Sequence, residues 1–340
     1  MKANITPLLN TLEFKKIPDS IYFSEDYKNY ISNSRLGLIN PKQDGNPEKF
    51  FGGFKPFNSP SLAIGSAVHE LTLQKDLFIL AEDLQKPTAK VGVLADLLYP
   101  IYLKRELTDN DYKEQSAIAD YYKGNLSEKQ LADVRSRCTP YLASRKAFEE
   151  SFIGTEEVIY LDSKSRQTVQ NCVAALNNNK GIQHLLNPKG LLEDPVSLTE
   201  MGILLEIEVE IPNIPKFRLR LKSKLDHLVI DKETNSIQVN DIKTIGKTVD
   251  QIGFNIDKFR YNREFAMYSW LLSLVAKKFY SMDNPTITGN YLIVSTIPQY
   301  YTKIVTMNSK MYQEGWDEFK YLLNLVINEI PNYKDFAIWM

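Results

Sequence analysis

The sequence feature that most constrains the fold is a strict alternation of apolar and charged residues in two neighbouring segments. Residues 205–211 alternate Leu, Ile, Val and Ile with glutamates, and residues 217–225 alternate Phe and Leu with Arg and Lys. Because successive side chains of a β-strand point to opposite faces, each segment is expected to form a half-buried strand. Residues 212–215 contain two prolines and supply the turn between them. The pattern therefore predicts an antiparallel strand pair.

The segments that follow predict a larger sheet covered by helices. We expect a third strand at 236–244, a helix at 258–278, and a strand pair at 289–297 and 299–307 around Pro298. A last helix should run from Ser309 to Glu329, with Asn308 as its N-cap. This order of elements predicts an α/β fold with a mixed central β-sheet flanked by helices.

The residues before this sheet are predicted to be mainly helical. A loop rich in Pro and Gly at 40–60 precedes a helix at 61–75, and a helical region at 109–150 has expected breaks near Gly124 and Pro140. Ser165 is the expected N-cap of a helix ending at Asn178. With no repeat or long linker among the 340 residues, we expect a single domain over 1–340. It comprises an N-terminal segment and loop at 1–60, a helical insertion at 90–150 and a catalytic core at 200–270.

Charge and cysteine content exclude several classes of protein. The chain has 41 basic and 42 acidic residues, so it lacks the overall positive charge of many nucleic-acid binders, and any contact with DNA must use a local patch. Its 2 cysteines cannot supply the four thiolates of an iron–sulfur or Cys-rich zinc site. The polar N-terminal residues and the lack of a long apolar run predict a cytoplasmic protein that does not enter a membrane.

A row of cations ends in an acid on one face of the second predicted strand. Period-2 alternation places Arg218, Arg220, Lys222 and Lys224 on the same face as Asp226. Taken alone, this row is equally well explained as a solvated strand face, because charged alternation commonly marks contact with water.

The next predicted strand adds a second acid and a lysine. Asp241 and Lys243 share one face of that strand, and Asp226 precedes Asp241 by 15 positions, enough for an antiparallel return that makes the two carboxylates neighbours. Two carboxylates and a phosphate oxygen suit the oxygen shell of Mg²⁺. Lys243 could position or deprotonate an attacking water and offset charge on the phosphate.

Longer stretches of sequence resemble a known family. The segments KSKLD (222–226), VNDIKT (239–244) and YNREFAMY (261–268) resemble the catalytic core of the PD-(D/E)XK nuclease superfamily, and more narrowly the RecE (exonuclease VIII) type of phage recombination exonuclease. YKNYISNSRL (27–36) is similar to that family's serine-rich N-terminal segment, and GSAVHEL (65–71) to its G-x-A-x-H-x-L helix. The resemblance covers about residues 25–330 apart from 90–150, and it implies a restriction-endonuclease-like core.

The resemblance also implies a role for each matching residue. Asp226 and Asp241 would bind the metal, Lys243 would be the catalytic lysine, and His69 would approach the metal from its helix. Glu206 is our choice for the family's strand glutamate; Glu208 shares its face and competes with it, and Glu193 or Glu200 would serve if the turn contains an insertion. Taken without the resemblance, His69 would be a core histidine.

One position departs from the family pattern. Where the family's helix commonly has Y-x-x-Q-x-x-x-Y, this chain has Glu264 between Tyr261 and Tyr268, and the spacing keeps all three on one helix face. We count Glu264 among the catalytic residues, with Arg263, Arg260 or the metal expected to compensate its charge. The residues expected to contact DNA are Arg218, Arg220, Lys222, Lys224, Lys247, Arg263, Tyr261 and Tyr268.

The expected function is a Mg²⁺- or Mn²⁺-dependent exonuclease that degrades linear duplex DNA from its ends to generate single strands for recombination. The resemblance implies a 5′ to 3′ direction, a single-strand annealing protein as partner and assembly into a ring. Two alternatives are a structure-specific or restriction-like endonuclease on the same fold, and a catalytically weak DNA-binding module.

Overall fold

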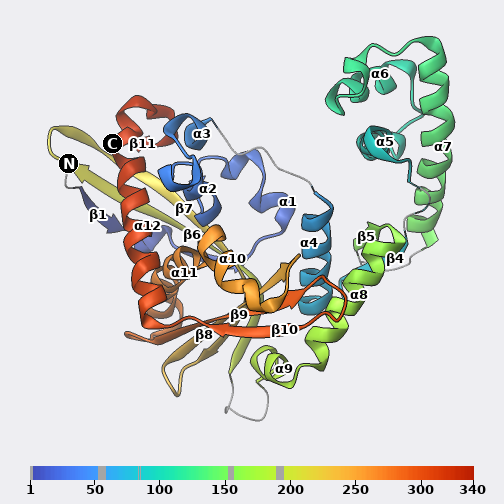
Figure 1. Ribbon diagram of the computed structural model, residues 1–340. Helices are drawn as coiled ribbons and strands as arrows, with labels where there is room; N and C mark the ends of the chain where they lie inside the picture. The colour runs from blue at the N-terminus through green and yellow to red at the C-terminus, as the bar shows by residue number, and fades with distance from the viewer. Residues whose placement is uncertain (1–2, 53–58, 83, 85, 152–156, 189–194) are drawn as a thin grey trace. The chain divides into compact units, whose positions relative to one another are not determined.

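The structure is a computed structural model that describes residues 3–52, 59–82, 84, 86–151, 157–188 and 195–340 (Figure 1). It divides the chain into two compact units, one formed by Met1–Gln74 with Thr168–Met340 and the other by Lys75–Gln167. The helical insertion expected at 90–150 falls inside the second unit. The single-domain description of the chain stays a prediction, and part of the loop expected at 40–60 lies outside the described residues.

The first unit is built on a mixed sheet, as expected. The main strands run in the order β1-β6-β7-β8-β9-β10, with β2 on β6 and both β3 and β11 on β7. All pairs are antiparallel except β8 with β9 and β3 with β7. The strands are β1 (Asn4–Pro7), β2 (Glu13–Lys16), β3 (Tyr30–Ile31), β6 (Val196–Ile211), β7 (Ile214–Asp231), β8 (Ser236–Ile245), β9 (Thr286–Ser295), β10 (Thr302–Thr306) and β11 (Ile338–Trp339).

Helices cover both faces of this sheet. On the face of β9 that carries Tyr291, Gly289 makes room for a helix, since a Cβ there would lie 2.2 Å from the Phe265 ring of α11. On the opposite face, Asn240 of β8 donates to the Leu185 carbonyl of α9 at 2.9 Å. The helices of this unit are α1 (Asp19–Tyr22), α2 (Asn33–Gly37), α3 (Pro47–Phe51), α4 (Pro60–Leu73), α9 (Lys180–Leu186), α10 (Ile252–Phe259), α11 (Tyr261–Val275) and α12 (Ser309–Glu329), together with most of α8 (Ser163–Asn178).

The second unit has its own small core. Buried apolar side chains of α5 (Ala89–Tyr102), α6 (Asp109–Ile118) and α7 (Glu128–Ser151) pack together, among them Leu94, Leu98 and Leu142. Two short parallel strands, β4 (Phe78–Glu82) and β5 (Glu157–Leu161), complete the unit.

The structure corrects several element boundaries. The first long strand, expected from residue 205, begins at Val196. The expected helix at 258–278 is two helices, because Arg260 adopts a left-handed conformation (φ 56°) between α10 and α11. Pro140 lies inside α7 and does not end it, and α8 begins at Ser163, before the expected cap at Ser165. The break near Gly124 and the Asn308 cap of α12 are confirmed.

Candidate active site

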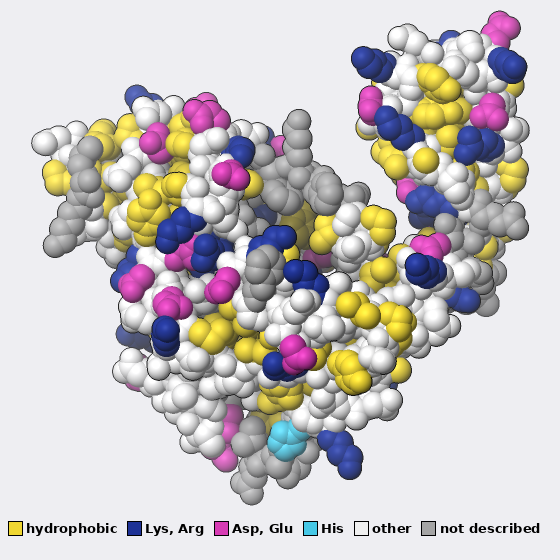
Figure 2. Space-filling view, in the orientation of Figure 1, with side chains coloured by type: hydrophobic (Ala, Val, Ile, Leu, Met, Phe, Trp, Pro, Cys, Tyr) yellow, Lys and Arg dark blue, Asp and Glu magenta, His cyan; other side chains and the backbone are white. Residues whose placement is uncertain are grey.

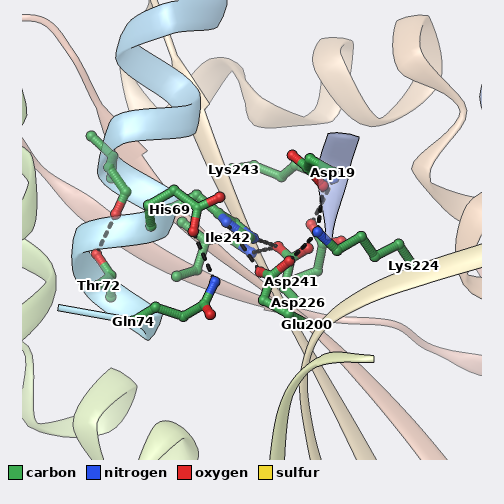
Figure 3. A network of polar contacts seen from close by, with 12 residues as sticks. Asp19, His69, Thr72, Gln74, Glu200, Lys224, Asp226, Asp241, Ile242 and Lys243 are labelled. Atoms are coloured by element: carbon green, nitrogen blue, oxygen red, sulfur yellow. Dashed lines mark hydrogen bonds and ion pairs between the residues drawn. The ribbon is translucent and has the colours of Figure 1, made fainter. Parts of the chain in front are cut away.

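The two predicted aspartates are neighbours on adjacent strands. His227 of β7 pairs with Asn240 of β8, and this register places Asp226 beside Asp241 on the same face of the sheet. Asp226 Oδ2 accepts a hydrogen bond from the backbone N–H of Ile242 at 2.9 Å. Figure 3 shows both carboxylates close together beside α4. The structure thus brings together the pair that the sequence predicted.

Helix α4 places His69 beside this pair of aspartates. Gly65, one turn earlier in α4, permits a close approach to β8, since a Cβ there would lie 3.1 Å from Thr244 Oγ1. His69 Nε2 lies 2.9 Å from Asp226 Oδ2, and His69 Nδ1 lies 3.4 Å from Glu200 Oε1 (Figure 3). The imidazole therefore bridges two carboxylates.

Lys243 connects the aspartates to α11. Its Nζ lies 2.7 Å from Asp241 Oδ2 and 3.4 Å from Glu264 Oε2. The Tyr261 ring lies 5.1 Å from the same ammonium, within the range of a cation–π contact. The charge of Glu264 is thus compensated by Lys243. The expected partners Arg260 and Arg263 pair with Glu318.

The charges of the site shift the pKa values of its groups in different directions. Burial, together with the neighbouring charge of Asp226, holds the pKa of Asp241 well above its ordinary value. Burial alone would raise the pKa of Asp226 and lower the pKa of His69. The attraction between the two charged groups outweighs burial, so the pKa of Asp226 is lowered and the pKa of His69 is raised to about 9. Burial would also lower the pKa of Lys243, yet Asp241 and Glu264 raise it well above its ordinary value. The ammonium of Lys243 is therefore protonated at neutral pH.

Glu200 occupies the place that we expected Glu206 to fill. β6 pairs Thr199 with His227 and Met201 with Leu225, so Glu200 lies opposite Asp226. Its backbone is left-handed (φ 58°), a conformation that costs energy in a residue with a side chain and that is often found at functional sites.

The other candidate glutamates lie elsewhere or outside the described residues. Glu206 lies farther along β6, where it pairs with Arg218 at 3.3 Å, and Glu208 lies 3.6 Å from Lys216. Glu193 falls outside the described residues. The structure therefore does not bring Glu206 or Glu208 to the aspartates.

The cationic row of β7 is mostly engaged inside the protein. Lys222 is only 8% exposed and donates to the Tyr22 carbonyl at 2.6 Å, and burial lowers its pKa to about 8. Lys224 pairs with Glu200 at 2.5 Å and with Asp19 (Figure 3). Arg220 is half-buried, with its guanidinium 5.6 Å from the Tyr30 ring. The row is thus neither a solvated face nor an open phosphate-binding surface, because the N-terminal segment covers it.

The residues of α11 expected at the DNA are also internal. Arg263 has 2% of its side chain exposed and donates from Nε to Asn33 Oδ1 at 2.7 Å. The Tyr268 hydroxyl donates to the Lys224 carbonyl at 3.1 Å, and Tyr261 is buried beside Lys243. These contacts make the three residues supports of the site. Among the described Lys and Arg residues that were expected to contact DNA, only Lys247 is exposed.

The donor set fits a divalent cation. Ligand atoms of His69, Glu70 and Glu200 lie within 4.8 Å of one another, and Asp226 contacts the same imidazole. Asp241 Oδ2 and Glu200 Oε1 are buried, and each is in an ion pair, the first with Lys243 Nζ at 2.7 Å and the second with His69 Nδ1 at 3.4 Å. A divalent cation would further neutralise these clustered carboxylates, because buried charge is costly and hard cations prefer oxygen ligands. Glu70 was not predicted from the sequence, although it directly follows His69 in the GSAVHEL motif.

Comparison with known proteins adds little to this geometry. No protein-family model matches the chain. No curated protein matches it either. Among solved structures, it is similar to the crystal structure of a "Putative exonuclease" from Eubacterium rectale, with 13% identity and a TM-score of 0.46 over 95% of this chain and 90% of that one. A likeness this weak leaves the activity to be argued from the site.

The surface is consistent with the balanced composition. Figure 2 shows Lys and Arg side chains interspersed with Asp and Glu on the face in view, as the net charge of −1 would suggest. No described helix is both long and apolar enough to cross a membrane. A cytoplasmic location stays a prediction.

Proposed function

We propose that this chain is a metal-dependent DNA nuclease that degrades linear duplex DNA from its ends. The observation that carries the proposal is the convergence of Asp226, Asp241 and Lys243 in one buried site, with His69 and Glu200 beside them. The D-x-K pattern alone is common by chance. The pattern is far more specific when a carboxylate from a second strand and a histidine from a helix lie beside it, as they do here.

The residues of the site would have distinct roles. Asp226, Asp241, Glu200 and His69 would hold Mg²⁺ or Mn²⁺, which would polarise the scissile phosphate and lower the pKa of a water. Lys243, protonated and anchored 2.7 Å from Asp241, would donate to a phosphate oxygen or orient the attacking water. Its raised pKa argues against a role as general base. Glu264 and the Tyr261 ring would hold the ammonium in place.

The finer parts of the proposal rest on the family resemblance alone. These are the attack from DNA ends, the 5′ to 3′ direction, the role in recombination, the RecE-like or phage relationship, the single-strand annealing partner and assembly into a ring. Binding to DNA ends would depend on few exposed cations, since most of the β7 row is engaged internally. We therefore expect a modest decline of affinity with salt.

The test compares two forms of the same DNA. Linear duplex labelled at its 5′ or 3′ ends and a covalently closed circle are incubated with Mg²⁺, and with EDTA as control. We expect the linear DNA alone to be degraded, with early release of the 5′ label and no reaction in EDTA. Cutting of the closed circle would instead support the endonuclease alternative, and DNA binding without degradation in Mg²⁺ or Mn²⁺ would support the binding module.

A further inference from the structure

Phe23 is the most exposed aromatic side chain in the described part of the chain, with a relative exposure of 66%. It directly follows α1. A single exposed apolar residue is ordinary on a protein surface, so its position must decide whether it has a role. Two observations about that position point to a ligand.

The first observation is that Phe23 is held in place. Lys222 of β7 donates to the Tyr22 carbonyl at 2.6 Å, and Lys224 pairs with Asp19 at the start of α1. The Phe23 ring packs edge-on against the buried Tyr22 ring, with centroids 5.0 Å apart. The strand therefore anchors the backbone that immediately precedes the exposed ring, which lowers the entropy lost when that ring binds a ligand.

The second observation is that Phe23 lies beside the cationic row of β7 that leads to the carboxylate site. Lys222 Nζ lies 5.8 Å from the Phe23 ring, and Lys222 precedes Asp226 by four residues on the same strand face, about 13 Å. Lys224, between them, contacts Glu200 of the site at 2.5 Å. Phe23 is thus within a few nucleotides' reach of the proposed catalytic groups.

The surroundings of Phe23 alternate aromatic and basic side chains. The Tyr27 and Tyr30 rings lie 5.0 Å apart, and the Arg220 guanidinium lies 5.6 Å from the Tyr30 ring. Surfaces that bind single-stranded nucleic acid commonly combine aromatic rings for the bases with cations for the backbone. Phe259 and Phe279 also have a lysine close to the ring, at 5.4 and 5.1 Å, so the greater exposure of Phe23 and its anchoring to β7 are what set it apart.

We propose that Phe23 is a base-stacking residue for single-stranded DNA, on which an unpaired base of the strand entering the carboxylate site stacks. This inference rests on the proposed nuclease function and names the form of substrate that the site receives. Phe23 contributes to binding and takes no part in hydrolysis. Stacking on an aromatic ring is tolerant of base identity, so the contact favours single strands without selecting a sequence.

The test measures binding of a short fluorescein-labelled oligothymidine by anisotropy, with Ca²⁺ in place of Mg²⁺. Phe23→Ala and Phe23→Leu should each weaken binding about 5- to 150-fold, whereas Phe23→Trp should bind as wild type does, because only an aromatic ring stacks. Tyr321→Ala is the matched control: Tyr321 is 50% exposed on α12, and its loss should leave binding unchanged.

A kinetic measurement separates this inference from the proposed function. On linear duplex with Mg²⁺, Phe23→Ala should raise KM and leave kcat within about twofold, as expected when a contact shared by ground and transition states is lost. Wild-type binding by Phe23→Ala, or by Phe23→Leu, would overturn the stacking role even if the protein degrades DNA. Failure of the wild-type protein to degrade DNA would overturn the proposed function, while the binding assay would still report on Phe23.

Discussion

At the strand positions that form the site, the two faces of β7 and β8 carry different kinds of buried polar group. One face carries carboxylates and the other carries neutral side chains. On one face, Asp226 and Asp241 are neighbouring carboxylates, and each is in an ion pair, Asp226 with His69 at 2.9 Å and Asp241 with Lys243 at 2.7 Å. On the other face, the adjacent His227 and Asn240 are neutral, and their side chains hydrogen-bond each other at 3.0 Å. Burial lowers the pKa of His227 to about 4, which keeps it uncharged at neutral pH.

The neutral face forms a continuous ladder across the sheet. Asn290 donates to Asn240 Oδ1 at 2.9 Å, Thr306 donates to Asn290 Oδ1 at 2.8 Å, and the Ser197 hydroxyl lies 3.0 Å from His227 Nε2. Satisfied buried polar groups of this kind fix strand register. Buried clusters of carboxylates and cations are costly to folding and are retained where they bind or react. The comparison therefore separates a structural face from a functional one.

The largest effects should come from the functional face. Asp226→Ala, Asp241→Ala and Lys243→Ala should each lower the rate of DNA degradation by at least about 100-fold, because each removes charge stabilisation at the phosphate. Wild-type turnover by the three variants would refute the site assignment.

Metal affinity should distinguish the two aspartates of this set from Lys243. Asp226→Ala and Asp241→Ala should lose Mn²⁺ binding measured by calorimetry, because each removes an oxygen ligand. Lys243→Ala should retain it, since an ammonium is not a ligand. If Lys243→Ala lost Mn²⁺ as completely as Asp241→Ala, the proposed division of roles would be wrong.

On the structural face, the effect should be on stability. Asn240→Ala removes a fully buried amide together with its hydrogen bonds to His227, to Asn290 and to the Leu185 carbonyl. We expect the free energy of unfolding to fall by about 1–3 kcal/mol in urea denaturation. Activity per folded molecule should stay near the wild-type value. A selective loss of activity with wild-type stability would contradict the contrast between the faces.

The smallest effect should come from Glu264, at the edge of the functional face. Glu264→Gln removes one of the two carboxylates beside Lys243 and keeps a hydrogen-bonding side chain there. We expect the rate to stay within about threefold of wild type or to increase, with an unchanged Mg²⁺ requirement. A large shift of the Mg²⁺ titration to higher concentration would show instead that Glu264 is a metal ligand.

The sequence predicted the parts of this arrangement that depend on short-range pattern. Period-2 alternation identified the strands, and the Asp226, Asp241 and Lys243 cluster followed from strand faces together with the family resemblance. The position of Glu200 did not follow, because β6 begins nine residues before the alternation becomes visible at Leu205. Only the pairing register shows which glutamate lies opposite Asp226.

The burial of the β7 cations could not be predicted for a related reason. Alternation shows that Lys222 and Lys224 share a face, but it does not show what covers that face. The cover comes from Asp19 and Tyr22, 200 residues or more away in sequence. Arg263 likewise pairs with Asn33 through a contact that spans 230 residues.

Release of nucleotides from end-labelled linear duplex DNA, with Mg²⁺ and with EDTA in parallel, tests the central claim most directly. Wild type and Asn240→Ala, normalised to folded protein, should release nucleotides at similar rates with Mg²⁺ and none with EDTA. Asp241→Ala, altered at the adjacent residue on the opposite face, should release none in either condition. Equal release by wild type and Asp241→Ala, or release that persists in EDTA, would contradict the claim that the Asp226 and Asp241 face is a metal-dependent nuclease centre.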